Sequence, residues 1–487
     1  MRTTDSILNL VAQWTQLLFS RNIGEITNVI QKYAPKSVED WRSYYYSHVK
    51  SEAHIEDLGK QLFERIDSFL NPQIHQITEQ YCIDYIKRVV INQSYNRYVA
   101  RINSEENVHL SKIHLQNYRS FEDTGEISIN TINFLVGANS CGKSSILKFF
   151  PLLKQSVVGK NFNGVFSWYA DDVDFKDFKN TLRNNAKIMT ITFGFSDDCS
   201  VSFEIMQSKE FFDIFKSVSF YEGDKLLYCL KKDELSYADK RYFLPIIDIM
   251  KFGNVKFAIL QKMSLIDTAI ASLAKRIIYV KPIRANINRY YRLRNDSIEE
   301  IESDGSNLPM FLYSLSDDSL KSYNAFLYDY FGFEIKLRRS EGNVEILILE
   351  KDGLPRNAVD MGYGYTELLP ILTTIWNSLR KQKDYTFIVI EQPEVHLHPK
   401  FQSKFAKMLC KVIKNYPNLR FFIETHSETI LNAVGREIDY KRANPNDINV
   451  LLIEKDKNGI STVKSTGYDN DGYLKDWPVN FLDEDAD

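Results

Sequence analysis

The chain has few cysteines, no long apolar run and almost no excess of charge of either sign. Its five cysteines are scattered and form no Cys-x-x-Cys pair, so neither a disulfide framework nor a zinc site is predicted. No apolar run reaches the ~18 residues that a membrane-spanning helix needs, and no secretion signal is recognisable. The net charge of -3 gives no overall basic field, so a nucleic-acid contact would require a local patch. We therefore expect a cytoplasmic protein without a membrane anchor.

The length of 487 residues and the hydrophobic content of 44% predict two or three domains with well-filled cores. Residues 1–107 contain few glycines and prolines, and their apolar residues recur at helical spacing. We predict a helical N-terminal domain there, acting as an adaptor or dimerisation element. Residues 108–481 alternate strand-like and helical segments, which predicts an α/β domain with a mostly parallel sheet. An inserted α/β region is expected around 185–350, and residues 482–487 form an acidic tail.

A complete phosphate-binding loop lies at residues 137–144, between the apolar run Ile132–Val136 and a predicted helix at Ser145–Gln155. The two glycines let the backbone N–H groups turn toward phosphate oxygens, and Lys143 reaches the β- and γ-phosphates. The Ser144 hydroxyl is predicted to bind Mg²⁺. The sequence therefore predicts ATP and Mg²⁺ as cofactors. The loop residues predicted to bind the nucleotide are Gly137, Asn139, Ser140, Gly142, Lys143, Ser144 and Ser145.

Two further strand ends carry groups that suit phosphate chemistry. The apolar run that begins at Tyr385 ends in Glu391-Gln392-Pro393-Glu394, and Glu391 has the position of the acid that holds the metal and polarises the attacking water. A second run ends in Ile-Glu-Thr-His-Ser-Glu at residues 423–428, which brings His426 to the same edge of the sheet. From there the imidazole could contact the γ-phosphate or the water. His426 is therefore a catalytic candidate.

A second glycine turn, at Asp360–Pro370, precedes an apolar helical segment. Two glycines and a hydroxyl at a helix start can form a second anion-binding nest. Its candidate residues are Gly362, Gly364 and Thr366. A glycine turn that merely caps a helix is the commoner use of such a pattern.

These four motifs, in this order, resemble the head domains of ATPases of the ATP-binding cassette and structural-maintenance-of-chromosomes (ABC/SMC) type. The resemblance implies a P-loop ATPase head with a mixed, largely parallel sheet flanked by helices plus an antiparallel β subdomain, here preceded by the all-α N-terminal domain. The glycine turn at 362–364 would be the signature motif. In this group the signature of one subunit closes over the nucleotide of its partner, which implies a head-to-tail dimer with two shared ATP sites.

More narrowly, the phrases at 137–145, 390–399 and 423–428 look like the bacterial ATPases related to the overcoming-lysogenization-defect proteins. The ending, with Gly472, Trp477-Pro478 and Phe481, is similar to the tail of one branch of these proteins. Members often serve in anti-phage defence with a nuclease that is fused or encoded nearby. No fused nuclease is recognisable after Ser427, because no strand-ending glutamate followed by Asp-x-Asp is found there.

The sequence departs from the family pattern at several positions. The usual catalytic glutamate is Gln392 here, so the general base could be Glu391, Glu394 or a residue of the partner subunit, and hydrolysis could be slow. Thr366 and Glu367 stand where many relatives have serine and glutamine. Gln155 is a candidate for the glutamine loop, but a side chain that simply faces along its own helix is the preferred explanation.

Two functional hypotheses follow. The first is a dimeric, Mg-ATP-dependent sensor or switch of an anti-phage defence system that controls a separate effector nuclease or toxin. The second is a DNA-binding repair or chromosome-maintenance ATPase. The basic stretch Lys275–Arg294, which has tyrosines at 290 and 291 and no carboxylate, suits nucleic acid and equally suits a solvated face. A nuclease in the N-terminal region is not favoured, because Arg42 and His48 are six residues apart and point to different sides of a helix.

Overall fold

The computed structural model describes residues 60, 109–158, 164–209, 212–231, 269–285, 288–293, 298–380 and 385–476. Apart from Lys60, these residues belong to one compact unit, formed by residues 107–247 and 266–487. The predicted helical domain, with Arg42 and His48, and the acidic tail lie outside the described residues. Within the described part, no helix has both the length and the apolar character needed to cross a bilayer.

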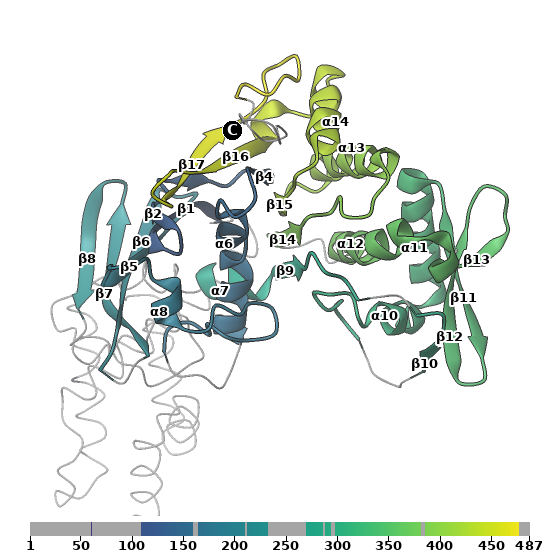
Figure 1. Ribbon diagram of the computed structural model, residues 1–487, viewed down its shortest axis with the longest axis horizontal. Helices are drawn as coiled ribbons and strands as arrows, with labels where there is room; N and C mark the ends of the chain where they lie inside the picture. Colours follow the sequence, from purple (N-terminus) through teal and green to yellow (C-terminus); the bar gives the residue numbers. More distant parts are fainter. Residues whose placement is uncertain are drawn as a thin grey trace, which may run out of the picture. The chain divides into compact units, whose positions relative to one another are not determined.

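The functional half of the large sheet consists of five parallel strands, in the order β16 (Ile448–Lys455), β4 (Ile132–Val136), β15 (Leu419–Glu424), β14 (Thr386–Glu391) and β9 (Ile277–Val280). Strands of a parallel sheet are covered on both faces and therefore read as near-continuous apolar runs. All five residues of β4 are buried, as this rule predicts. Because the strands are parallel, the ends of β4, β15 and β14 lie at one edge of the sheet (Figure 1).

An antiparallel half continues the same hydrogen-bonded sheet, which has 13 strands among the described residues. Two of its strands, Ile188–Phe195 and Cys199–Gln207, alternate buried and more exposed residues. The strands are β1 (Leu110–Tyr118), β2 (Phe121–Asp123), β3 (Ile127–Ser128), β5 (Ile188–Phe195), β6 (Cys199–Gln207), β7 (Asp213–Glu222), β8 (Lys225–Lys231) and β17 (Ser461–Thr466).

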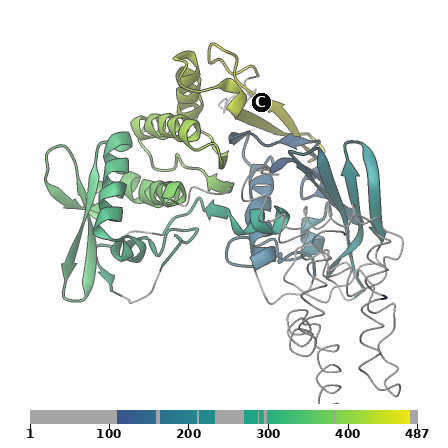
Figure 2. The same cartoon turned by 180° about the vertical axis from the view of Figure 1, so that it is seen from behind.

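Helices cover both faces of the parallel strands. Phe150 of α7 (Phe149–Val158) packs on Phe422 and Phe387, with ring centroids 4.2 and 5.9 Å apart, so α7 and the preceding α6 (Lys143–Leu147) lie on one face. The alternate strand residues share a core with helices on the opposite face, namely α12 (Tyr363–Arg380), α13 (Pro399–Asn415) and α14 (Glu428–Asp439). Figures 1 and 2 show this division from the two sides.

A separate antiparallel sheet lies beyond α12 and packs with two further helices. Its strands are β10 (Tyr291–Arg292), β11 (Glu334–Ser340), β12 (Asn343–Leu349) and β13 (Pro355–Asn357). The two helices are α10 (Leu308–Ser314) and α11 (Asp317–Phe331). They are separate because Ser316 caps α11 by accepting a hydrogen bond from Ser319 N. Short helices occur at α8 (Phe178–Thr181), η3 (Ala358–Met361) and η4 (Pro445–Asp447).

The predicted mixed α/β architecture is therefore confirmed within the described residues: parallel strands flanked by helices, with an antiparallel β part. The region expected as an insertion lies in two places. Strands β5–β8 extend the edge of the large sheet, whereas β10–β12 belong to the second sheet.

Candidate functional site

The loop between β4 and α6 has the backbone conformation of a phosphate cradle. Gly137, Ser140 and Gly142 all have positive φ angles, of 152°, 61° and 115°. A Cβ on Gly137 would lie 2.1 Å from Ile453 O, and one on Gly142 would lie 2.8 Å from the Phe121 ring. Both positions therefore require glycine, for conformation and for space.

Two side chains of this loop form hydrogen bonds with other groups of the site. Lys143 is 3% exposed, and its Nζ donates hydrogen bonds to Gly137 O at 2.9 Å and Ala138 O at 2.6 Å. The Ser144 hydroxyl donates to Glu424 Oε1 at 3.0 Å. The lysine is therefore folded over the concave side of the loop, and the hydroxyl points to the strand end of β15.

A pocket of about 750 Å³ opens over this loop and has a mainly polar lining. Its lining combines the phosphate loop, the ends of β14 and β15, and three segments that the motifs do not include. The lining residues are Arg119, Ser120, Asn139, Ser140, Gly142, Lys143, Ser144, Ser145, Asn180, Leu182, Arg183, Asn184, Gln392, Glu424, His426, Lys455, Asn458 and Gly459.

The pocket brings together most of the predicted loop residues with two of the four catalytic candidates, Gln392 and His426. Gln392 has a φ of 44° and donates its backbone N–H to Glu424 O at 2.9 Å, which fixes the turn after β14. Burial, followed by the nearby Lys143 charge, lowers the pKa of His426 and so favours the neutral imidazole. A neutral ring can donate with one nitrogen and accept with the other.

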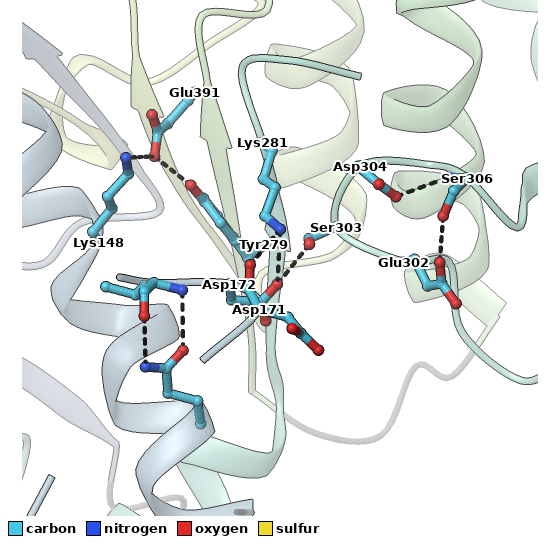
Figure 3. Close-up of polar contacts among 12 residues, drawn as sticks. Lys148, Asp171, Asp172, Tyr279, Lys281, Glu302, Ser303, Asp304, Ser306 and Glu391 are labelled. Atoms are coloured by element: carbon cyan, nitrogen blue, oxygen red, sulfur yellow. Dashed lines mark hydrogen bonds and ion pairs between the residues drawn. The ribbon is translucent and has the colours of Figure 1, made fainter. Parts of the chain in front are cut away.

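Glu391 and Glu394 do not line the pocket. Glu391 Oε1 accepts a hydrogen bond from Tyr279 Oη at 2.5 Å and lies 3.7 Å from Lys148 Nζ (Figure 3). Burial raises the pKa of Glu391, and the Lys148 charge and the Tyr279 hydrogen bond oppose this shift. The roles of Glu391 in metal binding and catalysis stay predictions.

Glu394 anchors the loop that carries the histidine. Its Oε2 accepts from Thr425 Oγ1 at 2.8 Å and its Oε1 accepts from His426 N at 2.7 Å. Burial raises the pKa of Glu394, and these donors oppose the shift. Both carboxylate oxygens therefore hold the backbone of the His426 segment in place.

Sequence reasoning missed Glu424, which ends β15 and contacts Ser144 directly. Glu424 is 3% exposed, and burial raises its pKa while Ser144 and Lys143 oppose the shift. It stands in the same phrase as His426 and pairs in register with Glu391 on β14. Comparison of the two strand ends would have found it. Arg119 and Arg183 in the pocket lining were also missed, because no motif surrounds them.

The second glycine turn does not line this pocket. Gly362 has a φ of 84°, α12 begins at Tyr363, and the Thr366 hydroxyl donates to Tyr363 O at 2.8 Å within the first turn. Gln155, the candidate glutamine-loop residue, instead holds the segment around Val173 in place. Its side chain donates to Val173 O and accepts from Val173 N, each at 3.1 Å.

Several cations of the basic stretch Lys275–Arg294 are engaged within the fold. The Arg284 side chain is 1% exposed, pairs with Glu367 at 2.9 Å and donates to Glu391 O at 3.0 Å. Lys281 lies 3.8 Å from Asp172, whose carboxylate accepts from Ser303, and Arg289 pairs with Asp360 (Figure 3 shows the Lys281 group). Arg294 lies outside the described residues. The stretch is therefore not a continuous free basic surface.

The strand order and the loop define a P-loop ATPase domain, in which the histidine strand β15 separates the phosphate-loop strand β4 from the acidic strand β14. A family model described as "AAA domain, putative AbiEii toxin, Type IV TA system" matches residues 132–432, which is more than half of the chain. The chain belongs to this family of AAA domains. The narrower relation to the overcoming-lysogenization-defect proteins stays a prediction.

A second family model, described as MjaI restriction endonuclease, matches residues 5–135. The end of that match covers strands β1 to β4, which belong to the large sheet of the ATPase domain. No protein with a curated description matches the chain.

Similar solved structures include three SMC heads. The SMC head domain from Thermotoga maritima is 14% identical with a TM-score of 0.38, and the similarity covers 73% of this chain and 98% of that chain. An SmcHead bound to the C-winged helix domain of ScpA is 13% identical with a TM-score of 0.41, and the similarity covers 74% of this chain and 98% of that chain. A Pyrococcus furiosus Smc head bound to the C-terminal domain of ScpA is 11% identical with a TM-score of 0.37, and the similarity covers 74% of this chain and 96% of that chain.

Proposed function

We propose that the protein binds ATP with Mg²⁺ at the phosphate-loop pocket and hydrolyses it there. The observation that carries this proposal is that Lys143, Ser144 and His426 line one pocket around a glycine cradle. Bound Mg²⁺ would neutralise the β- and γ-phosphate charge, and Ser144 with a carboxylate at a strand end would hold it. Lys143 would bind phosphate, and His426 would contact the γ-phosphate or the water.

The residue that follows Glu391 in the chain limits the rate of the proposed reaction. Gln392 has an amide, which can position water but cannot accept its proton. Glu394 is held by Thr425 and His426, and Glu391 is held by Tyr279 and Lys148. The base is therefore Glu391 or Glu394 after a local rearrangement, or a residue of the partner subunit. Slow turnover is expected in each case.

The working form is proposed to be a head-to-tail dimer. Gly362, Gly364 and Thr366 do not line the pocket of their own subunit, so as nucleotide-binding residues they would act on a second copy. Gly362 and Tyr363 are exposed, which leaves this surface accessible for such a contact. Each of two shared sites would then consist of one phosphate loop and one signature turn.

The biological role is proposed to be that of a sensor or switch in a bacterial anti-phage defence system, controlling a separate effector nuclease or toxin. The description of the family names a toxin and a type IV toxin–antitoxin system, and this supports a two-component arrangement. ATP binding would close the dimer and hydrolysis would release it, so that the effector follows the nucleotide state. Loss of phage protection in cells that carry Lys143→Ala with the native neighbouring genes would support this role. Unchanged protection would contradict it.

Nucleotide binding is tested with Lys143→Ala and Glu391→Gln. We expect Lys143→Ala to abolish binding of a fluorescent ATP analogue, because the only cation folded into the described loop is lost. Glu391→Gln is expected to retain binding and to stall phosphate release. Lys321→Ala, an exposed lysine on α11, is the matched control and should behave as wild type. Normal hydrolysis by Lys143→Ala would refute the assignment of the site, and normal hydrolysis by Glu391→Gln would refute a role of Glu391 in the reaction.

The dimer is tested by mixing two inactive proteins. Lys143→Ala removes the phosphate loop function, and Thr366→Arg blocks the exposed signature turn without entering the pocket of its own subunit. Random pairing in an equal mixture makes about half of the dimers heterodimers, and each heterodimer contains one intact composite site of two. The mixture should therefore recover about a quarter of the wild-type activity. If the mixture stays inactive and light scattering detects only monomers with ATP, the dimer proposal fails.

A nuclease within this chain is a second candidate, because residues 5–135 are similar to a restriction endonuclease. Incubation of the purified chain with plasmid DNA and Mg²⁺, with and without ATP, tests it, and cleavage that survives removal of contaminating nucleases by a second column would support it. The alternative of a repair or chromosome-maintenance ATPase that acts on DNA receives less support, because Arg284 and Arg289 of the basic stretch are already paired. Salt-dependent DNA binding that vanishes in Arg289→Ala/Arg292→Ala would revive it.

A further inference from the structure

Two buried carboxylates lie side by side at the site, on neighbouring strands. Glu391 ends β14 and Glu424 ends β15, and the two residues are direct partners in the parallel register. Side chains at paired positions of a sheet point to the same face. Here that face is the one covered by α6 and α7, because Glu424 contacts Ser144 and Glu391 contacts Lys148. Either carboxylate could therefore serve the phosphate loop.

Only Glu424 is directed into the pocket. Its Oε1 accepts the Ser144 hydroxyl at 3.0 Å, and the residue is part of the pocket lining. Its Oε2 is buried and has no hydrogen-bond partner among the described residues. A buried carboxylate oxygen without a donor is costly unless a ligand compensates it. The orphaned oxygen thus fits a cation bound next to the serine hydroxyl.

The Glu391 carboxylate contacts two side chains outside the pocket. Tyr279 donates to Glu391 Oε1, and Lys148 lies 3.7 Å from the same oxygen (Figure 3). A phenol and an ammonium already compensate this carboxylate, and it does not line the pocket. Its contacts suit a residue that orients β14 and the following Gln392.

We infer that Glu424, at the end of the histidine strand, is the carboxylate that joins Ser144 in holding the Mg²⁺ of the nucleotide. This inference rests on the proposed ATP binding. Mg²⁺ keeps several waters and is usually held by one or two carboxylates together with substrate phosphates.

The experiment compares Glu424→Gln with Glu391→Gln in the full-length protein. Glutamine keeps an oxygen that can accept the Ser144 hydroxyl and removes only the charge. The affinity for a fluorescent non-hydrolysable ATP analogue is measured with EDTA and with Mg²⁺, and Mn²⁺ binding in the presence of the analogue is followed by electron paramagnetic resonance. Glu454→Gln, an exposed glutamate on β16, is the control.

We expect Glu424→Gln to bind the analogue in EDTA as tightly as wild type does. The increase in affinity that Mg²⁺ produces should be at least about tenfold smaller than in wild type, with a matching loss of bound Mn²⁺. Glu391→Gln and the control should keep that gain. Glu424→Asp, which retains the charge, should restore part of it and serves as the test if Glu424→Gln does not fold.

Two results are decisive against the inference. If Glu424→Gln keeps the full Mg²⁺ gain and Glu391→Gln loses it, Glu391 is the metal acid and Glu424 only orients Ser144. If wild type binds no nucleotide in EDTA or in Mg²⁺, the proposed function itself fails and the metal role fails with it. The EDTA measurement separates these two outcomes.

Discussion

Arg284 joins the start of α12 to the end of β14 through a buried ion pair. Its side chain is 1% exposed and that of Glu367, in the first turn of α12, is 13% exposed, with 2.9 Å between Nη1 and Oε2. Nη2 donates to Glu391 O at 3.0 Å and Gln392 O at 3.4 Å. Burial lowers the pKa of Arg284, and the Glu367 contact opposes this shift. One guanidinium therefore ties the first turn of α12 to the end of β14 and the turn that follows it.

Arg284→Met should be strongly destabilising. It leaves Glu367 without its partner and removes the donor from two backbone carbonyls. Removal of one member of a buried ion pair costs about 3–5 kcal/mol. This loss corresponds to a decrease in Tm of roughly 5–10 °C. Arg289→Met is the matched control, because the Arg289–Asp360 pair is half exposed, and its Tm should stay close to that of wild type.

A double-mutant cycle isolates the pair itself. Arg284→Met, Glu367→Met and the double variant are unfolded by urea and by heat, with circular dichroism as the signal. The double variant contains no uncompensated charge, so its loss should be smaller than the sum of the single losses by about 1–3 kcal/mol. Additive losses would refute the reasoning, as would a Tm of Arg284→Met that equals that of the Arg289→Met control.

Three further outcomes are expected from buried groups elsewhere in the ATPase domain. Burial raises the pKa of Asp213 to about 6, so the folded state binds its proton more tightly than the unfolded state does. The free energy of unfolding should therefore fall by up to ~3 kcal/mol as the pH rises from about 4 to about 6. Urea unfolding of Asp213→Asn should lack this pH dependence. Gly472→Ala should lower the Tm far more than Gly125→Ala, because both have positive φ but only at Gly472 would a Cβ lie 2.0 Å from Gly435 O; equal changes in thermal scans would contradict this. Tyr279→Phe should cost about 1.5–3 kcal/mol in urea unfolding, because it removes a buried donor to a carboxylate, and no loss would mean that Lys148 alone compensates Glu391.

The motifs that need a particular backbone could be predicted from the sequence. The phosphate loop specifies glycine where φ is positive and where a Cβ would collide with Ile453 O or Phe121. Apolar patterns in the sequence coincide with two strands to within one residue: the alternating run 188–195 with β5, and the near-continuous run 419–423 with the buried strand β15. Local chemistry and burial decide these features, and both are visible in a single sequence.

The boundaries of helices and strands within longer apolar stretches were harder to predict than these motifs. The apolar run Ile127–Val136 contains two strands, β3 and β4, separated by a turn in which Asn130 N donates to Asn133 Oδ1 at 2.9 Å. The helix expected at 145–155 consists of α6 and α7. Side-chain hydrogen bonds to the backbone interrupt periodic segments in this way, and hydrophobic periodicity does not detect them.

The site residues divide according to what determines their position. Ser144 and Lys143 are placed by the loop that contains them, so the motif alone identifies them. Glu424 becomes a partner of Ser144 only because β15 lies between β4 and β14, and this strand order is a property of long-range pairing. A strand inserted between the loop strand and the acidic strand moves Glu391 one strand away from Ser144 and leaves its own terminal carboxylate next to the hydroxyl. The order of the strands thus determines which of two similar glutamates meets the phosphate loop.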